Sequence, residues 1–271
     1  MTRRVLGVDG CPTGWVCVTL VDGAVTQVEV VEALEEAVEG EGFAAVGVDM
    51  PIGLADGPRE ADAAARNLLP GRASSVFSAP PRTVVDGARD GTLTTHAEAT
   101  AAAVACCGAG ISMQAWRLVP RIVEVDGLIG RHPELHEVHP EVAFALLVGD
   151  VLPRKRSWAG VTTRRAVLER HGVLLPDRFP GDTEAGPDDV LDAAVCAFVA
   201  DAIAGAGEVV TLPDETLQRD HGRPITITGR IPPPALPGPR KRPRSAQPDP
   251  PQRVPTAAAS SVESPHEQDA V

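Results

Sequence analysis

Residues 5–49 read VLGVDGCPTGWVCVTLVDGAVTQVEVVEALEEAVEGEGFAAVGVD and combine short apolar runs with strong turn signals. Asp22-Gly23 is a typical hairpin signal, and it indicates that the apolar runs on its two sides are antiparallel strands. The fully apolar run at the end of the segment is typical of a buried parallel strand. The expected elements are strands over 5–9, 15–21 and 25–31, a helix over 32–41 and a strand over 44–49.

The order of these elements predicts the architecture. Three strands joined by hairpins, then a helix and a buried parallel strand, predict an α/β domain with the mixed sheet of the ribonuclease H-like fold. In this fold the first three strands are antiparallel, the later strands are parallel, and helices flank the sheet. We expect one such domain over 1–231, with a helical insert after the fourth strand over about 54–130.

The rest of the chain is expected to supply further helices and a tail. The clearest helix is predicted over 187–205, where Leu191, Val195 and Phe198 belong to one apolar stripe. From 232 onward Pro, Ser, Ala and charged residues dominate, so 232–271 should be a disordered tail. The other expected elements are a strand over 135–139, helices over 140–147 and 162–171, and edge strands over 208–212 and 225–231.

Composition narrows the possible functions. A net charge of −12 argues against a protein that coats nucleic acid non-specifically, because such binding needs a positive field. We find no signal peptide and no apolar run of about 18 residues, which predicts a cytoplasmic protein without a membrane span. The five cysteines are odd in number and contain no CxxC pair, so we expect reduced thiols and no zinc finger.

Acidic residues end the first and fourth predicted strands. Asp9 and Asp49 each follow an apolar run, and Gly10 and Gly14 allow a tight turn after the first of them. In the predicted topology these two strands are parallel neighbours, so the two carboxylates should lie close together. Two like charges at short range are unfavourable unless a proton or a cation lies between them. The ends of such strands are also where open α/β sheets bind ligands.

Further candidates lie on two other predicted elements. Asp189 and Asp192 are three residues apart at the start of the clearest helix, so they share a face. They point either toward the sheet as ligands or merely complement the helix dipole, and for Asp192 we favour the first. Glu137 and His139 share a face if the strand over 135–139 is extended. They either complete the site or form a satisfied polar strand end.

Carboxylates that converge from separate elements suit Mg²⁺ or Mn²⁺, which prefer oxygen ligands. Two such ions about 3.5–4 Å apart can activate water and stabilise a leaving oxygen, which is the chemistry of phosphoryl transfer. The predicted metal ligands are Asp9, Asp49, Asp189 and Asp192, and the predicted catalytic residues are Asp9, Asp49, Asp192, Glu137 and His139.

A cluster of basic and hydroxyl residues follows the fourth strand. Arg66, Arg72 and Arg82 are interleaved with Ser74 and Ser75, and together they could hold the phosphates of a nucleic acid. The alternative is a solvated helix face followed by a proline-rich loop. We favour phosphate binding because the segment directly follows a candidate metal ligand.

The sequence also resembles a known family, domain-of-unknown-function family 429. The resemblance covers about residues 4–232, and its motifs together are specific. They are GVDGC over 7–11, VDMPIG over 48–53, RASSVF over 72–77, PPR over 80–82, GISMQAW over 110–116, EVHPE over 137–141 and DDVLDAA over 188–194.

This resemblance implies a ribonuclease H-like nuclease. The segment DVLDAA over 189–194 is also similar to the last-helix motif of Holliday-junction resolvases, in which two aspartates bind metal. Asp9 and Asp49 match the acids on strands one and four of that group. The chain departs from proteins that stack single-stranded bases, because it has no Tyr, five Phe and three Trp.

The leading hypothesis is therefore a metal-dependent nuclease with nucleic acid as its substrate. An ATP-dependent phosphotransferase of the actin-like and sugar-kinase group is a second, since residues 9–14 loosely resemble its first phosphate loop. About 230 ordered residues are too few for the two domains that such enzymes need. A binding module that keeps the fold without catalysis is a third. DNA or RNA as substrate, endonucleolytic or exonucleolytic cleavage, and the oligomeric state all stay open.

Overall fold

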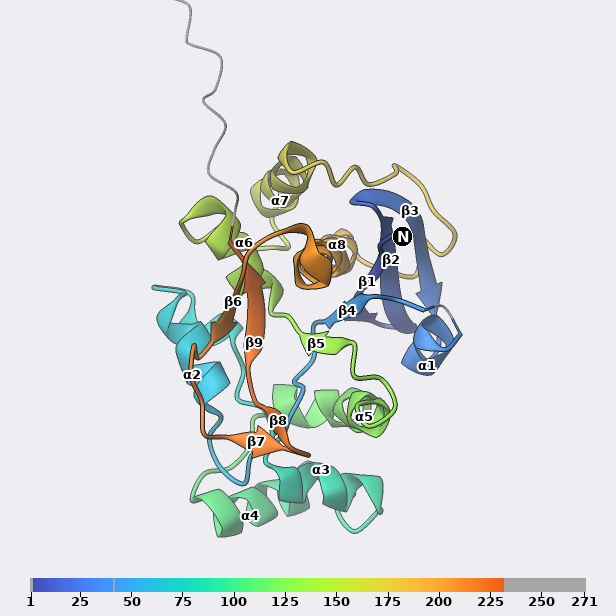
Figure 1. Cartoon of the computed structure of the whole chain (residues 1–271). Coiled ribbons are helices and arrows are strands. Elements are labelled where there is room, and N and C mark those ends of the chain that lie inside the picture. Colours follow the sequence, from blue (N-terminus) through green and yellow to red (C-terminus); the bar gives the residue numbers. More distant parts are fainter. Residues whose placement is uncertain (1, 41, 232–271) are drawn as a thin grey trace, which may run out of the picture. The chain divides into compact units, whose positions relative to one another are not determined.

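The centre of the structure is a five-stranded mixed sheet with the strand order β3-β2-β1-β4-β5 (Figure 1). The computed structural model describes residues 2–40 and 42–231. β2 is antiparallel to both β1 and β3, whereas β4 is parallel to both β1 and β5. The predicted ribonuclease H-like sheet is therefore confirmed. Its strands are β1 (Arg4–Cys11), β2 (Gly14–Val21), β3 (Ala24–Val31), β4 (Ala45–Val48) and β5 (Leu135–Glu137).

Local sequence explains the first turns and the buried strand. Asp22 and Gly23 have φ angles of 50° and 83°, the left-handed values that a tight hairpin between twisted strands requires. β1 and β2 meet at Cys11 opposite Gly14. β4 is buried at every position, as a parallel strand covered on both faces should be.

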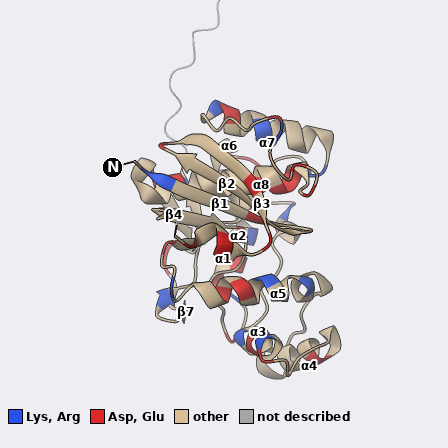
Figure 2. Cartoon of the chain, turned by 90° about the vertical axis from the view of Figure 1, so that its right-hand side faces the viewer, with Lys and Arg blue, Asp and Glu red and all other residues tan. Residues whose placement is uncertain are grey.

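Helices cover both faces of the sheet (Figure 2). Successive residues of a strand point to opposite faces, so Val5 packs in the core on the α8 side and Leu6 in the core on the α5 side. One face carries α8 (Pro187–Asp201) with α6 (Pro140–Val148) and α7 (Trp158–Arg170), and the other carries α1 (Leu34–Val38) and α5 (Met113–Leu128).

Two glycines bring α8 unusually close to the sheet. A Cβ atom on Gly7 of β1 would overlap the backbone of Ala193 and Ala197 in α8. A Cβ atom on Gly47 of β4 would likewise meet the carbonyl oxygen of Cys196. The absence of side chains at these positions lets the helix backbone lie directly on β1 and β4.

The predicted helical insert after β4 is confirmed. α4 begins with a capping box between Thr95 and Glu98 and ends at Gly108, which has a left-handed φ of 74°. α3 and α4 pack against α5 around buried residues that include Val84 and Val119, and they form a layer beyond α5 in Figure 2. The elements of the insert are α2 (Glu60–Asn67), the 3₁₀ turn η1 (Ala73–Ser75), α3 (Arg82–Arg89), α4 (His96–Cys107) and α5.

The last strands differ from the prediction of edge strands for the central sheet. β6 and β9 pair with each other in a separate two-stranded sheet, because Ile225 and Ile227 are buried in a third core with α2 and α6. β7 and β8 form a short hairpin. The elements after α8 are the π-helical turn η2 (Ala202–Ala206), β6 (Val209–Leu212), β7 (Arg219–Asp220), β8 (Arg223–Pro224) and β9 (Ile227–Arg230).

Two other boundaries are shorter than predicted. The helix expected over 32–41 is only α1, and the strand expected over 135–139 ends at Glu137 because His139 caps α6 and Pro140 begins it. Among the described residues, none of the helices has the length and apolar character needed to cross a membrane. The tail predicted over 232–271 lies outside the described residues.

Candidate metal centre

Asp9 and Asp49 project from neighbouring parallel strands toward the same helix. Side chains alternate along a strand, so Asp9 points to the same face as Gly7, which α8 covers. Asp49 directly follows β4 and shares its face with Gly47, which also lies under α8. The backbone N–H of Asp49 donates to the carbonyl of Val8 at 2.9 Å, which extends the parallel register to this residue. Both carboxylates therefore face α8.

The third carboxylate comes from α8 itself. Asp192 lies one helical turn before Cys196, which packs over Gly47, so both residues are on the face toward the sheet. Asp9, Asp49 and Asp192 each offer an oxygen, and these oxygens all lie within 4.8 Å of one another. We call these residues the acidic trio. Two of them are buried and Asp49 is half-buried.

Burial makes the acidic trio unfavourable to ionise. The pKa of Asp9 is well above its ordinary value, first because burial penalises the charged form and then because Asp49 and Asp192 repel it. Burial also raises the pKa of Asp49 to about 6 and that of Asp192 to about 7. At neutral pH the trio therefore has a strong requirement for protons or a cation.

Among the described residues, Lys155 forms an ion pair with the trio, and one oxygen of the trio is left without a partner. Lys155 Nζ lies 2.5 Å from Asp192 Oδ2. The other oxygen, Asp192 Oδ1, is buried and has no hydrogen-bond partner among the described residues. Such an acceptor costs about 1–3 kcal/mol, which a bound cation would recover. Because the groups that converge here are all carboxylates, the residues fit Mg²⁺ or Mn²⁺, which prefer oxygen ligands.

The acidic trio lines a cavity of about 690 Å³, which we call the trio cavity. Five basic side chains line the same cavity, although the net charge of the chain is −12, and the further acid on its wall, Glu141, is paired with Arg164. Acidic oxygens beside basic side chains suit an anionic ligand that a cation bridges to the carboxylates. The basic residues on the wall are Arg72, Arg121, Arg154, Lys155 and Arg156.

Sequence reasoning missed most of this basic wall. Arg154, Lys155 and Arg156 lie in the segment between α6 and α7, and their proximity to the trio depends on how that segment folds back over α8. The available signal was the run of three basic residues in an acidic chain, just before the N-cap Ser157. Arg121 of α5 gave no comparable signal.

A family model with the description "Protein of unknown function (DUF429)" matches residues 7–218, a span that contains the whole acidic trio. The chain belongs to the DUF429 family. No curated protein and no solved structure matches it. Because the family description states no activity, the chemistry of this DUF429 protein has to be inferred from its own residues.

Glu137 of this DUF429 protein does not join the acidic trio. It lies in register with Val48, whose side chain is in the core on the α5 side, whereas the trio faces α8. Its carboxylate accepts a hydrogen bond from Ile52 N at 2.7 Å and forms an ion pair with buried Arg59. Burial raises the pKa of Glu137 to about 7. These contacts hold the segment that follows Asp49.

His139 and Asp189 lie near the trio but have partners of their own. His139 lines the trio cavity, its Nδ1 accepts from Val142 N at 3.5 Å, and its ring also hydrogen-bonds to the backbone of Ser75. Burial lowers the pKa of His139, so its imidazole is neutral at pH 7. Asp189 accepts from Gly186 N at 3.0 Å and so caps α8.

The predicted phosphate-binding residues separate into two groups. Arg72, Ser74 and Ser75 line the trio cavity. Arg66 donates to a backbone carbonyl at 3.1 Å and lines a neighbouring cavity instead. Arg82 lines neither cavity, because its guanidinium is bound to acidic side chains elsewhere.

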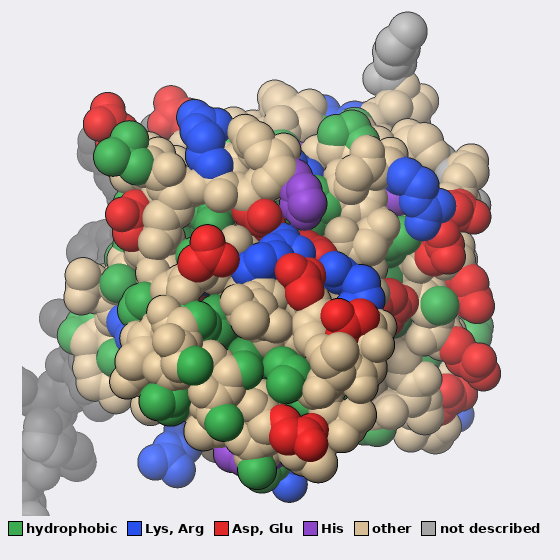
Figure 3. Space-filling model, turned by 90° about the horizontal axis from the view of Figure 1, so that it is seen from below, with side chains coloured by type: hydrophobic (Ala, Val, Ile, Leu, Met, Phe, Trp, Pro, Cys, Tyr) green, Lys and Arg blue, Asp and Glu red, His purple; other side chains and the backbone are tan. Residues whose placement is uncertain are grey.

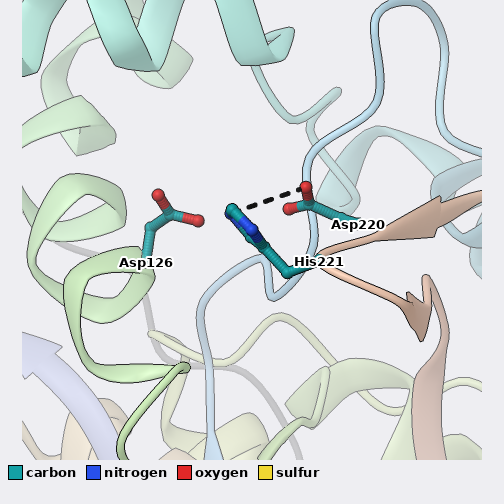
Figure 4. A group of neighbouring side chains, drawn as sticks. All are labelled: Asp126, Asp220 and His221. Carbon is teal, nitrogen blue, oxygen red and sulfur yellow. Dashed lines mark ion pairs between the residues drawn. The ribbon is translucent and has the colours of Figure 1, made fainter.

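Those acidic partners belong to a second acidic group, Asp126, Asp220 and His221, whose ligand atoms also lie within 4.8 Å of one another (Figure 4). His221 Nε2 is 3.8 Å from Asp220 Oδ1. Arg82 pairs with Asp126 at 2.8 Å and with Asp220, and Arg89 also pairs with Asp126. Figure 3 shows that acidic and basic side chains lie side by side on the face of the molecule that is seen from below. Arginines thus neutralise this group, and it has no comparable need for a metal.

Without divalent cations, the acidic trio should destabilise the protein as the pH rises. Burial raises the pKa values of Asp9, Asp49 and Asp192, so the folded state retains protons that the unfolded chain releases, and stability is lost between about pH 4 and 7. In Asp9→Asn this loss should be smaller. The free energy of unfolding of Asp9→Asn minus that of wild type should therefore increase by roughly 2 kcal/mol between about pH 4 and pH 7. Urea unfolding of both proteins in EDTA measures the difference.

The comparison with Asp9→Asn is needed because histidines act in the opposite direction. Burial lowers the pKa values of His136, His139 and His171, so the stability that they contribute is lost as the pH falls. These contributions are common to both proteins and cancel in the difference. A difference that is constant or decreases with pH would contradict repulsion within the trio.

Proposed function

We propose that this protein is a metal-dependent nuclease that hydrolyses phosphodiester bonds in nucleic acid. The observation that carries the proposal is the acidic trio, with its unpartnered buried oxygen, in a cavity lined by basic side chains. Carboxylates on one side and cations on the other suit a phosphodiester that Mg²⁺ or Mn²⁺ bridges to the protein. The ribonuclease H-like sheet and the similarity of residues 189–194 to the last-helix motif of Holliday-junction resolvases support the same activity.

Asp9, Asp49 and Asp192 would hold the ion, and Asp189 is close enough to raise the pKa of Asp9 and Asp49. When bound, such an ion supplies a Lewis acid that lowers the pKa of a water and stabilises the leaving oxygen. The protein would contribute by holding the three carboxylate ligands in fixed positions. Two ligands are fixed by adjacent parallel strands, and the third by a helix that lies directly on glycines of those strands.

Basic residues of the trio cavity would orient the phosphate. Arg154 makes no ion pair with any described residue, and Arg72 is held by one hydrogen bond, from Nη2 to the carbonyl of Leu152 at 2.8 Å. Arg121 instead donates to the carbonyls of Cys11 and Gly14, so it shapes the turn after Asp9. Ser74 and Ser75 add hydroxyls to the same wall.

His139 is the candidate for proton transfer, because a neutral imidazole on the cavity wall can accept a proton. To do so at Nδ1, its unprotonated nitrogen, it would give up the hydrogen bond that Nδ1 accepts from Val142 N. Glu137 is better assigned as a positioning residue, since it ties the backbone of Ile52 and the guanidinium of Arg59 behind Asp49.

The two alternative functions, a phosphotransferase and a binding module, differ from the nuclease in the domains or the activity that they require. The described residues belong to one compact unit, whereas phosphotransferases of the actin-like group need two domains, so we favour the nuclease. A binding module would bind metal and nucleic acid without turnover.

Hydrolysis by the full-length protein of labelled single-stranded, double-stranded and branched DNA and RNA tests the proposal. We expect cleavage that requires Mg²⁺ or Mn²⁺, stops with EDTA and weakens with salt, because phosphate contacts release counterions. Titration calorimetry measures ion binding separately. Binding of neither ion at millimolar concentration, with or without nucleic acid, would exclude the metal nuclease, and binding without hydrolysis would favour the binding module.

A further inference from the structure

A second cavity, of about 670 Å³, adjoins the trio cavity. The two cavities share Ser74, Phe77 and Gln114, so these residues lie where the two cavities meet. Its volume is in the range of about 300–1,000 Å³ typical of small-molecule sites. The wall of the second cavity comes from three segments, within 57–66, 73–81 and 107–114.

The charged side chains on the wall of the second cavity already make hydrogen bonds within the protein. Arg59 pairs with Asp62 at 2.9 Å, and the other oxygen of Asp62 accepts from Ala79 N at 2.8 Å. Arg66 donates to the carbonyl of Val76 at 3.1 Å and to a serine hydroxyl at 2.8 Å. Within the described residues Arg59 and Asp62 thus neutralise each other, and Arg66 is the cation on this wall that has no acidic partner. The second cavity carries fewer charged side chains than the trio cavity, so it suits a neutral part of a ligand.

Two side chains on the shared wall suit a flat heterocycle. Phe77 is half-exposed, and an aromatic ring in this position can stack on a base. Gln114 is exposed, and its amide makes no hydrogen bond to another described residue. An amide with a free donor and a free acceptor can bond the polar edge of a base.

We propose that the second cavity binds one nucleobase of the substrate, next to the phosphodiester at the acidic trio. This inference rests on the proposed nuclease function and names its substrate class. A base inside a cavity cannot stay paired, so the substrate is an unpaired nucleotide or a single-stranded end. A single stacking position also agrees with a chain that has no Tyr, five Phe and three Trp.

AMP and ribose 5-phosphate test the proposal, because they differ only in the base and neither contains a phosphodiester bond. In calorimetric titrations with Mg²⁺, the full-length protein should bind AMP about tenfold more tightly, as expected for stacking of one base. Phe77→Ala removes the stacking ring, and Ala109→Trp fills the cavity from an exposed position on its wall. Both variants should abolish the preference and leave the affinity for ribose 5-phosphate unchanged.

Two control variants make the result specific. Ala101→Trp adds the same bulk at an exposed position of α4 outside the cavity and should keep the preference. Phe77→Tyr retains an aromatic ring and should keep it too. Equal affinity of the wild type for both ligands, no measurable binding of AMP, or a preference that survives both Phe77→Ala and Ala109→Trp would overturn the nucleobase site.

The outcome is distinguishable from failure of the nuclease function, because binding of AMP needs no hydrolysis. A preference for AMP that the two variants abolish, in a protein that cleaves no nucleic acid, would support the nucleobase site and overturn the nuclease. Cleavage of nucleic acid without a preference for AMP would do the reverse.

Discussion

Asp9→Asn and Asp192→Asn should each lower nuclease activity at least ~10³-fold, equivalent to about 4 kcal/mol of transition-state stabilisation. Asparagine keeps the size of the side chain but removes the charge that would hold a divalent ion. The stabilisation of the folded protein by Mg²⁺ or Mn²⁺, measured as a rise in melting temperature, should disappear in both variants. Calorimetric titration of each ion into wild type and variants checks the same loss without an activity assay.

Asp126→Asn is the matched control for this experiment. Asp126 belongs to the other group of clustered acids, but Arg82 and Arg89 already neutralise it. The substitution should lower stability, because it removes a buried carboxylate that Arg82 and Arg89 share, while the response to Mg²⁺ stays as in wild type. A metal response that survives in Asp9→Asn but is lost in Asp126→Asn would show that the ion binds at the second acidic group and not at the acidic trio.

Much of the trio was predictable because it depends on local patterns. Alternation along β1 and β4 places Asp9 and Asp49 on one face, and their parallel pairing follows from the order of the elements. The apolar stripe of α8 fixes which side of the helix meets the sheet, and that side includes Asp192. The sequence does not give the distance between Asp192 and the two strand carboxylates. This distance depends on the close approach of α8 to the sheet, which Gly7 and Gly47 allow.

The same reasoning from strand alternation does not determine the position of Glu137. An extended strand puts Glu137 and His139 on one face, but the pattern does not say which face meets the trio. The register with β4 decides this, and it pairs Glu137 with Val48 rather than with a residue on the α8 side. A shift of one residue would reverse the orientation, and nothing in a three-residue strand specifies it.

Charge partners far apart in sequence are the other part that could not be predicted. Arg82 is separated by 44 residues from Asp126 and by 138 from Asp220, so its proximity to Ser74 and Ser75 in sequence was a poor guide. Lys155 reaches Asp192 across a separation of 37 residues. Such pairs depend on the packing of whole segments rather than on any local pattern.

Lys155→Met should raise the affinity for Mn²⁺ and Mg²⁺ about tenfold, a change of about 1.4 kcal/mol. The ammonium of Lys155 is the cation that the protein itself supplies to Asp192, and a divalent ion at the same carboxylate has to compete with it. Methionine keeps much of the apolar stem and removes the charge. Without divalent ions the variant should be less stable at pH 8 by about 1–3 kcal/mol, less than for a fully buried pair because part of Lys155 is exposed.

Arg156→Met is the matched control, since Arg156 is the next residue, carries the same charge and pairs with Asp188 at 3.0 Å instead of with the trio. Its effect on metal affinity should be small, because the Arg156 side chain is 82% exposed and solvent screens it. Calorimetric titration of Mn²⁺ into both variants separates a contact effect from a general loss of positive charge. If Lys155→Met binds the ion more weakly than wild type, Lys155 orients Asp192 for the metal rather than competing with it.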